Sequence, residues 1–401
     1  MPAVRSRLSR DFYLVTAANF VFFLNFASFF LLPLHLKDLG VTEQTIGYIM
    51  GTAGCAGLCV LPFLGTLLDR VGRHRFVTAG ALSMALASFA YLAVPGAGAA
   101  IYVLRVIQGV SFTAAFVAAS TLAVELAPLE RRGEALGIFG ISTLTTHAIA
   151  PALGELVARR FGFNALFAIA GTLGLCATAM TLRVHVPADR VRSGPAAVGA
   201  RGLPHTTTLW LGAATMVACG MGFGAVLTFV PTFVKAIALD HVAPFFVSYT
   251  AAAVGVRFAL GGLSDRVGRR RVLLPSIALL ALSVLALGWV HSITTLVLVG
   301  LFFGAGQGMV YPTANALMVD LSRPENLGRV QTLFSGSFSV GVAASAFIFG
   351  GVIERFGYPT MFTVAAGCIA VGGVLLWASR DDEVPAGVPA HDALTFVQFE
   401  P

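Results

Sequence analysis

Charged residues are scarce in this chain. Asp, Glu, Lys and Arg together make up 11% of its 401 residues, whereas soluble domains contain about 25%. Hydrophobic residues make up 57% of the chain, and the mean hydropathy is +0.85. This composition excludes an ordinary soluble domain and indicates an integral membrane protein.

Cysteine is also rare, and familiar catalytic motifs are missing. The five cysteines form an odd number and lie within apolar runs, so they indicate no disulfide framework. Cys55 and Cys59 share one helical face, and we interpret them as small buried side chains rather than as a metal pair. The sequence contains no H-E-x-x-H, G-x-S-x-G or phosphate-binding loop. We therefore expect no enzyme activity, no metal and no cofactor.

Apolar runs long enough to cross a bilayer recur along almost the whole chain. A helix needs about 20 residues to cross a hydrocarbon core of roughly 30 Å. The runs are continuously apolar, which excludes the alternating strands of a membrane barrel. We predict twelve membrane helices, at residues 11–36, 45–67, 76–94, 99–124, 134–157, 163–184, 207–235, 244–263, 272–291, 294–318, 329–353 and 358–379.

The basic residues predict the orientation in the membrane. With the N-terminus inside, 19 arginines fall on the cytoplasmic side, and Arg105 and Arg257 fall within helices. The opposite side then holds only five basic residues, namely Lys37, Arg159, Arg160, Lys235 and Arg355. The net charge of +7 therefore faces the anionic cytoplasmic leaflet, and we expect no nucleic-acid partner. We predict a multi-pass protein of a bacterial-type inner membrane with both termini in the cytoplasm.

One sequence motif occurs twice. Residues 65–75 read GTLLDRVGRHR and residues 261–271 read GGLSDRVGRRR, which places the copies 196 positions apart (261 − 65). A second pair, RRFGF at 159–163 and ERFGY at 354–358, repeats with nearly the same spacing. The chain is therefore two homologous halves of six helices in the same membrane orientation. We predict an N-terminal bundle at 1–186, a cytoplasmic linker at 187–206, a C-terminal bundle at 207–379 and a disordered cytoplasmic tail at 380–401.

The repeated pattern G-x-L-x-D-R-x-G-R resembles the signature loop of the major facilitator superfamily of secondary transporters. Arg105-Val-Ile-Gln108-Gly109 is similar to the R-x-x-Q-G motif of that family. The resemblance covers nearly the whole chain. It implies an all-α integral membrane fold of twelve transmembrane helices, arranged in two six-helix bundles that are related by a parallel pseudo-twofold axis and work by alternating access.

The repeated motif predicts a conformational role. Asp69 and Asp265 lie near the partially negative C-terminal end of a helix, where a carboxylate is disfavoured. Each needs a partner, either the adjacent arginines or the N-terminus of another helix. The resemblance implies a partner in the other half, so that the motif is a latch that breaks as the halves rock; the alternative is a solvated turn. The latch residues would be Gly65, Asp69, Arg70, Gly72, Arg73, Gly261, Asp265, Arg266, Gly268 and Arg269.

Polar side chains within the membrane are costly and therefore mark candidate sites. Arg105 shares a helical face with Gln108 and Phe112. Facing a central cavity, Arg105 would bond carbonyls of the first helix or bind an anionic group. Arg257 is either an anchor that reaches toward the cytoplasmic surface or the ligand of a carboxylate or phosphate.

Other predicted cavity residues are polar or aromatic. Gln307, Tyr311 and Asn315 recur every four residues and form one polar stripe. The first helix supplies Asn19, Asn25 and Phe26 among many phenylalanines, and the seventh supplies Phe223. Aromatic walls with few charges favour an apolar or amphipathic solute over a sugar.

No Asp or Glu lies in the middle of the first, fourth, seventh or tenth predicted helix, so the sequence does not support proton coupling through a buried carboxylate. His147 lies close to mid-membrane beside Thr143, and histidine exchanges protons near neutrality; alternatively it is a neutral histidine satisfied by a neighbouring helix. APALG at 150–154 loosely resembles the G-P-x-x-G-G element of efflux antiporters, with Glu155 in place of the last glycine. Proton coupling would therefore need His147, Glu155, Asp69 or Arg105, and without it the protein is a facilitator.

Together these features predict a monomeric secondary transporter of a small molecule. We favour proton-coupled efflux of a largely apolar or amphipathic compound. One alternative is uptake or facilitated diffusion of a small organic anion, with Arg105 or Arg257 as its anchor. A second alternative, from another class, is a non-transporting membrane receptor of the same fold.

Overall fold

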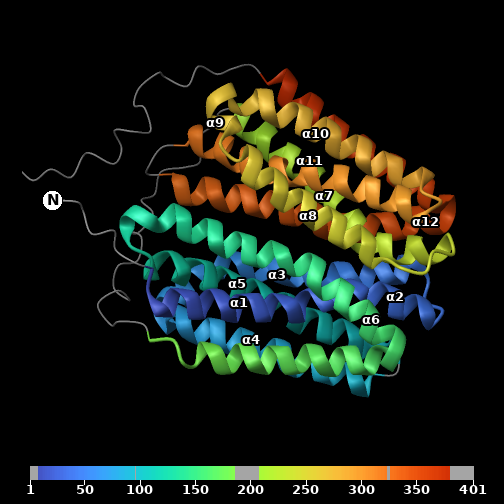
Figure 1. Ribbon diagram of the computed structural model, residues 1–401, viewed down its shortest axis with the longest axis horizontal. Coiled ribbons are helices and arrows are strands. Elements are labelled where there is room, and N and C mark those ends of the chain that lie inside the picture. The colour runs from blue at the N-terminus through green and yellow to red at the C-terminus, as the bar shows by residue number, and fades with distance from the viewer. Residues whose placement is uncertain (1–7, 95, 186–206, 323–325, 380–401) are drawn as a thin grey trace, which may run out of the picture.

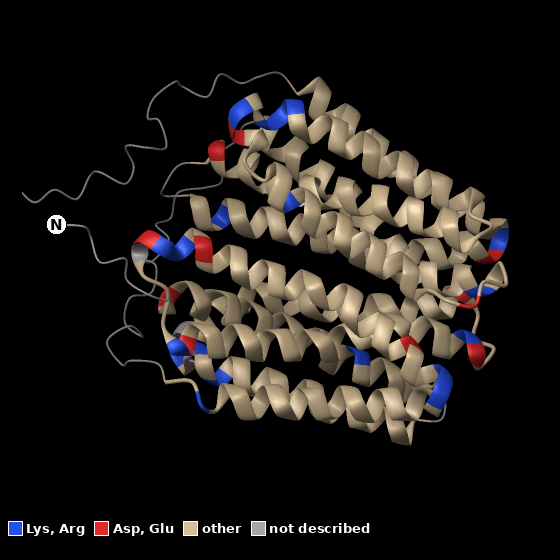
Figure 2. Ribbon diagram, viewed as in Figure 1, with Lys and Arg blue, Asp and Glu red and all other residues tan. Residues whose placement is uncertain are grey.

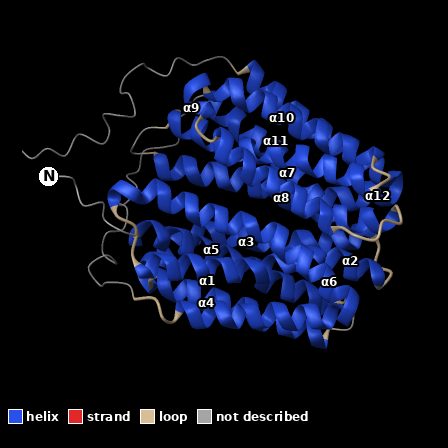
Figure 3. Ribbon diagram, viewed as in Figure 1, coloured by secondary structure: helices blue, strands red, loops and turns tan. Residues whose placement is uncertain are grey.

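The computed structural model describes residues 8–94, 96–185, 207–322 and 326–379, apart from the side chains of Asp69 and Leu129. Every regular element in these ranges is a helix (Figure 3). The linker predicted at 187–206 and the tail predicted at 380–401 lie outside the described residues.

The first half contains six long helical segments with short 3-10 turns between them. Its elements are α1 (Arg10–Ser28), η1 (Phe29–Leu31), α2 (Leu32–Asp38), α3 (Glu43–Val71), α4 (Arg73–Ala90), η2 (Tyr91–Ala93), α5 (Ala99–Leu126), η3 (Leu129–Arg131) and α6 (Arg132–Thr181). The second half repeats this plan with α7 (Thr207–Ala236), α8 (Ala243–Leu260), α9 (Leu263–Val267), α10 (Arg269–Ala286), η5 (Leu287–Trp289), α11 (Ile293–Asp320) and α12 (Leu327–Ala378).

The number of membrane spans agrees with the sequence. Among the described residues, ten helical stretches are long and apolar enough to cross a membrane. The two longest, α6 and α12, each contain one residue with non-helical backbone, Gly162 at φ 82° and Gly357 at φ 81°. Positive φ is a conformation that glycine adopts without steric cost. Each of these stretches is therefore two helices joined by a bend, and the twelve predicted helices are confirmed.

The two halves are bundles that lie side by side, α1–α6 in the lower part of the view and α7–α12 above them (Figure 1). We call the end that carries the turns at Gly72 and Gly268 the motif end, and the opposite end the far end. The N-terminal end of α1 and the C-terminal end of α6 also lie at the motif end, where Asp11 accepts a hydrogen bond from the His185 N–H. Charged residues gather mainly at the two ends, as a membrane-spanning bundle requires (Figure 2).

The halves touch tightly only toward the far end. Between α3 and α12, a Cβ added at Gly47 would collide with the carbonyl oxygen of Ala346, and one at Gly54 would press on Ala343. Toward the motif end the same two helices have room, because no neighbouring atom lies within 4 Å of a Cβ placed at Gly65 or Gly336. Small residues thus bring the two backbones together at one end only.

The contact between α6 and α8 follows the same trend. Polar contacts between the halves involve Glu155, near the far end, and His147, about midway between the start of α6 and the bend at Gly162. Nearer the motif end, a Cβ at Gly140 or Gly255 would meet nothing within 4 Å. Both interfaces are therefore packed at the far end and open toward the motif end.

Candidate functional site

Arg105 lies inside the first bundle. Its Nε and one terminal nitrogen donate to the carbonyl oxygens of Ile49 and Met50, at 3.4 and 3.3 Å, and the other terminal nitrogen donates to Gln108 Oε1 at 3.0 Å. The Tyr91 hydroxyl donates to the same Gln108 oxygen at 3.0 Å. The carbonyls belong to α3, whereas the sequence suggested the first helix. With 5% of its surface exposed, Arg105 joins α5 to α3.

The two asparagines of α1 have different surroundings. Asn25 is fully buried, and its Oδ1 accepts a hydrogen bond from Ser88 of α4 at 3.1 Å. Asn19 donates to the Thr143 hydroxyl of α6 at 3.0 Å, and its own Oδ1 has no partner. Asn25 therefore belongs to the interior of the first bundle, whereas Asn19 and Thr143 join the two helices that carry the aromatic contacts described next.

A row of aromatic contacts runs from the first bundle to the second. The rings of Phe112 and Phe26 stack with centroids 3.9 Å apart, and Phe26 meets Phe30 at 5.7 Å. Phe30 contacts His147 at 5.2 Å. Across the boundary between the halves, His147 Nδ1 lies 3.2 Å from the hydroxyl of Tyr249.

The row continues within the second bundle. Phe223 of α7 contacts Tyr249 and Phe338, with centroids 6.4 and 5.5 Å apart, and Phe338 meets Tyr311 at 5.2 Å. We call this row the aromatic seam; it consists of Phe26, Phe30, Phe112, His147, Phe223, Tyr249, Tyr311 and Phe338. Sequence reasoning missed Tyr249, although it lies about two turns before Arg257 on the same helix.

Arg257 lies beside the seam. Its Nε donates to the carbonyl oxygen of Gly308 on α11 at 3.2 Å, about one turn before Tyr311 of the seam, and Arg257 itself follows Tyr249 by about two turns on α8. Two side-chain oxygens on α11, Gln307 Oε1 and Asn315 Oδ1, are buried without a hydrogen-bond partner in the described structure. Buried acceptors of this kind call for water or a ligand that donates hydrogen bonds.

The predicted cavity residues therefore fall into two groups, one at the aromatic seam and one inside the first bundle. His147, Phe26, Phe112, Phe223 and Tyr311 belong to the seam itself, with Arg257 next to it. Arg105, Gln108 and Asn25 belong instead to hydrogen-bond networks inside the first bundle.

Glu155 lies at the far end, where it joins the two halves. Its carboxylate accepts hydrogen bonds from the backbone N–H of Val242, at 3.0 and 3.1 Å, and from that of Ala243 at 2.7 Å, where α8 begins. His241 and Arg159 lie within ion-pair range at 3.6 and 4.0 Å. A carboxylate at a helix N-terminus is favoured by the exposed N–H groups and by the helix dipole.

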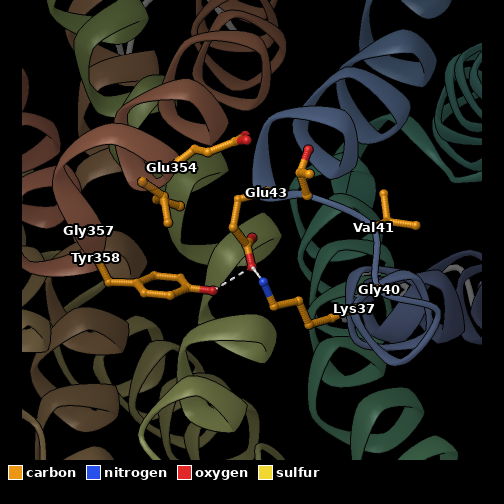
Figure 4. Close-up of a pocket in the computed structure, with 9 residues that line it drawn as sticks. Lys37, Gly40, Val41, Glu43, Glu354, Gly357 and Tyr358 are labelled. Carbon is orange, nitrogen blue, oxygen red and sulfur yellow. Dashed lines mark hydrogen bonds and ion pairs between the residues drawn. The ribbon is translucent and has the colours of Figure 1, made fainter.

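A second far-end carboxylate, Glu43, was missed by sequence reasoning. It is 5% exposed and contacts Lys37 at 2.9 Å, the Tyr358 hydroxyl at 2.7 Å and the Thr232 hydroxyl at 3.1 Å (Figure 4). Tyr358 and Thr232 belong to the other half. The only sequence signal is the position of Glu43 directly after Thr42, the N-cap of α3.

A pocket of about 430 Å³ opens beside Glu43 between the halves (Figure 4). It is lined by Lys37, Gly40, Val41, Thr42, Glu43, Ile353, Glu354, Gly357 and Tyr358. Near this pocket, Glu354 of α12 accepts a hydrogen bond from the Gln44 N–H, at the start of α3, at 3.4 Å. Each half thus places a carboxylate at the N-terminus of a helix of the other half.

The motif arginines pair within their own halves. Arg73 lies 2.5 Å from Glu125 at the end of α5, and Arg269 lies 2.9 Å from Asp320 at the end of α11. Asp265 forms an ion pair with Arg269, one of the partners that the sequence suggested.

The turns of the repeated motif depend on glycine. Gly72 and Gly268 have φ of 95° and 106°, the left-handed turns that were expected. Arg70 and Arg266 are exposed, and the side chain of Asp69 is not described. A Cβ added at Gly65 or Gly261 would meet no atom of another helix within 4 Å.

Within the ranges that the structure describes, no three His, Cys, Asp or Glu side chains come together in a way that would hold a metal ion. The helices, the seam between two bundles and the paired turns are those of a membrane transporter.

Comparison with known proteins identifies the family. The model of the Major Facilitator Superfamily matches residues 14–261 and 243–398. The chain belongs to the major facilitator superfamily, whose members are transporters and not enzymes.

Relatives of similar length are bacterial transporters. The MFS-type transporter YhhS of Escherichia coli (strain K12) is 25% identical over 377 residues, which cover 88% of this chain and 90% of that protein. The multidrug resistance protein MdtG of Dickeya zeae (strain Ech586) is 26% identical over 387 residues, or 91% of each chain.

Solved structures agree on the fold. A mutant of the nucleoside transporter NupG superposes with a TM-score of 0.78 at 14% identity, covering 92% of this chain and all of that one. A bacterial homologue of the human lysosomal transporter Spinster, in an inward-facing and occupied conformation, superposes with a TM-score of 0.77 at 11% identity and covers 93% of this chain and 97% of that one.

Proposed function

We propose that the protein exports a largely apolar or amphipathic small molecule by alternating access and that protons drive the export. The observation that carries this proposal is the aromatic seam, which crosses from one bundle to the other at His147 and Tyr249. Aromatic side chains provide apolar contact area, whereas a sugar would need many paired polar groups. The relatives named multidrug resistance proteins support the same substrate class.

The packing of the halves suggests where this structure lies in the transport cycle. If the motif end faces the cytoplasm, as the arginine distribution predicts, the far end faces outward and is closed here. Export then requires the contacts of Glu155 and Glu43 to break, so that the far end opens. At the motif end the halves would approach, and Asp69 and Asp265 would then find partners across the boundary, as expected of a latch.

We assign proton coupling to His147 because of its position between the halves. Its hydrogen-bond contact across the boundary, with Tyr249, would be lost or altered when the bundles rock, so the cost of charging the imidazole would differ between the two states. Among the other coupling candidates, Arg105 already uses three nitrogens inside one bundle, which favours a structural role. Glu155 is held at the far end and is better suited to gating.

Dye transport in inside-out vesicles with an acidic interior tests the proposal. We expect vesicles that contain the protein to accumulate some members of a panel of cationic, neutral and anionic amphipathic dyes, and His147→Asn to abolish the dependence of this accumulation on the pH gradient. His291→Asn is the matched control, because His291 is exposed at the far end. If no dye is moved, the efflux proposal fails; if dyes move regardless of the gradient, only proton coupling fails.

The cellular setting follows from the same argument. We propose a monomer in a bacterial inner membrane with both termini in the cytoplasm. One chain supplies both bundles and every residue of the aromatic seam, so transport needs no second copy. Cysteine-accessibility labelling at Arg5 and Trp289 from each side of the membrane would test the orientation.

A further inference from the structure

Arg257 points across its bundle rather than toward a membrane surface. It lies one turn before the end of α8, and its Nε donates to the Gly308 carbonyl of the neighbouring α11 at 3.2 Å. The approach depends on glycine, because a Cβ at Gly308 would press against Val256 and Ala253. An arginine that served only to reach the headgroup region would extend along its helix. The side chain of Arg257 is therefore held beside the aromatic seam.

Within the ranges described, no Asp or Glu forms an ion pair with Arg257. The contact that its side chain makes there is with the uncharged carbonyl oxygen of Gly308. Arg105 offers a contrast, because three of its nitrogens donate hydrogen bonds to protein oxygens. Only the Nε of Arg257 donates to a described protein group. An unpaired cation within a membrane protein is costly and marks a place where an anion is favoured.

The free part of the side chain has a defined shape. Because Nε is occupied by Gly308, the two terminal nitrogens remain and present a planar fork that fits a carboxylate with two parallel hydrogen bonds. A single positive charge balances a monoanion. A phosphate dianion would leave one negative charge uncompensated in a largely apolar setting.

We infer that the exported molecule is an amphipathic monoanion, whose carboxylate is bound by the terminal nitrogens of Arg257 and whose apolar body lies against the aromatic seam. The inference rests on the proposed function and names the substrate class of the same site. The rings that the second bundle contributes to the seam are Tyr249, Tyr311, Phe223 and Phe338. Gln307 Oε1 and Asn315 Oδ1, which lie on the same helix as Gly308, are buried acceptors without a hydrogen-bond partner in the described structure.

Equilibrium binding to the purified protein tests this assignment with a matched pair of fluorescent ligands. Pyrenebutyrate carries a carboxylate, and pyrenebutyramide has the same apolar body without charge. We expect wild type to bind the acid more tightly than the amide. Arg257→Gln should weaken binding of the acid by about 10- to 100-fold, the range for hydrogen bonds to a charged group, and leave binding of the amide unchanged.

Two further variants sharpen the experiment. Arg257→Lys should give an intermediate affinity for the acid, because charge is kept and the planar fork is lost. Arg271→Gln removes an exposed arginine from the same bundle and should change neither affinity. Retained amide binding in Arg257→Gln also shows that the variant is folded.

The possible failures are distinguishable. If wild type binds acid and amide equally, or if Arg257→Gln weakens both ligands equally, the carboxylate assignment is overturned while the amphipathic site stands. If wild type binds neither ligand, the apolar site in the proposed function fails and this assignment fails with it.

Discussion

Glu155 and Val242 are 87 positions apart in the chain, yet both carboxylate oxygens of Glu155 accept a hydrogen bond from the Val242 N–H. The two residues belong to different bundles, and Glu155 is 4% exposed. The contact therefore joins the halves at the N-terminus of α8, where a negative charge is stabilised by the helix dipole. It holds the halves together at the far end, beside His241 and Arg159.

Glu155→Gln should shift the protein toward a form that is open at the far end. The amide keeps its shape and one acceptor oxygen but loses the charge, so the bonds to Val242 and Ala243 weaken. Spin labels at the exposed positions Leu39 and Trp289, in a cysteine-free background, would report the separation of the two bundles by double electron–electron resonance.

We expect a longer distance between these labels in Glu155→Gln than in wild type. Glu130→Gln, which neutralises an exposed carboxylate at the motif end, should leave the distance unchanged. An identical distance distribution in wild type and Glu155→Gln would show that the carboxylate does not hold the far end closed.

Tyr358→Phe should weaken the second far-end contact. The variant removes the hydroxyl that donates to Glu43 at 2.7 Å, and a hydrogen bond to a charged group contributes roughly 1.5–3 kcal/mol. A cysteine placed at Ile353, which is 6% exposed in the pocket wall, should then react about tenfold faster or more with a membrane-impermeant maleimide. The control is Tyr13→Phe at the motif end. Equal labelling rates of this cysteine in the otherwise wild-type protein, in Tyr358→Phe and in Tyr13→Phe would contradict the prediction.

Gly47→Val should prevent closure of the far end. Its side chain would collide with the carbonyl oxygen of Ala346, a backbone group that cannot move aside. We expect the distance between labels at Leu39 and Trp289 to increase and dye export to stop. Gly367→Val is the matched control, because Gly367 is exposed on α12 with no neighbour within 4 Å. Normal closure in Gly47→Val would mean that the α3–α12 contact is looser than described.

Arg269→Gln should lower thermal stability more than Arg266→Gln. Arg269 pairs with Asp320 on α11 and with Asp265 in its own turn, whereas Arg266 is exposed. Because the side chains of Arg269 and Asp320 are 25% and 48% exposed, solvent screening limits the expected loss in free energy of unfolding to roughly 0.5–1 kcal/mol. Melting curves in detergent would measure the difference, and equal melting temperatures would show that the pair adds no stability.

The sequence predicted the fold because the relevant signals are local. Each membrane helix is an apolar run of its own, and the turns at Gly72 and Gly268 depend on neighbouring residues only. Contacts between the halves are different. Glu43 meets Tyr358 over 315 positions, and nothing near Glu43 in the chain indicates that partner. Arg105 likewise could be placed inside the membrane from sequence, but the helix that supplies its carbonyl partners depends on how the bundle packs.

The bends at Gly162 and Gly357 have a consequence for the outer face that the orientation predicts. They let two pairs of helices reverse direction with almost no connecting chain, and the longest far-end connection between helices, 237–242, has six residues. A protease or an antibody that approaches from outside the cell would therefore meet only short segments between helices. If the far end faces outward as predicted, tags or epitopes would have to be inserted into these short connections deliberately.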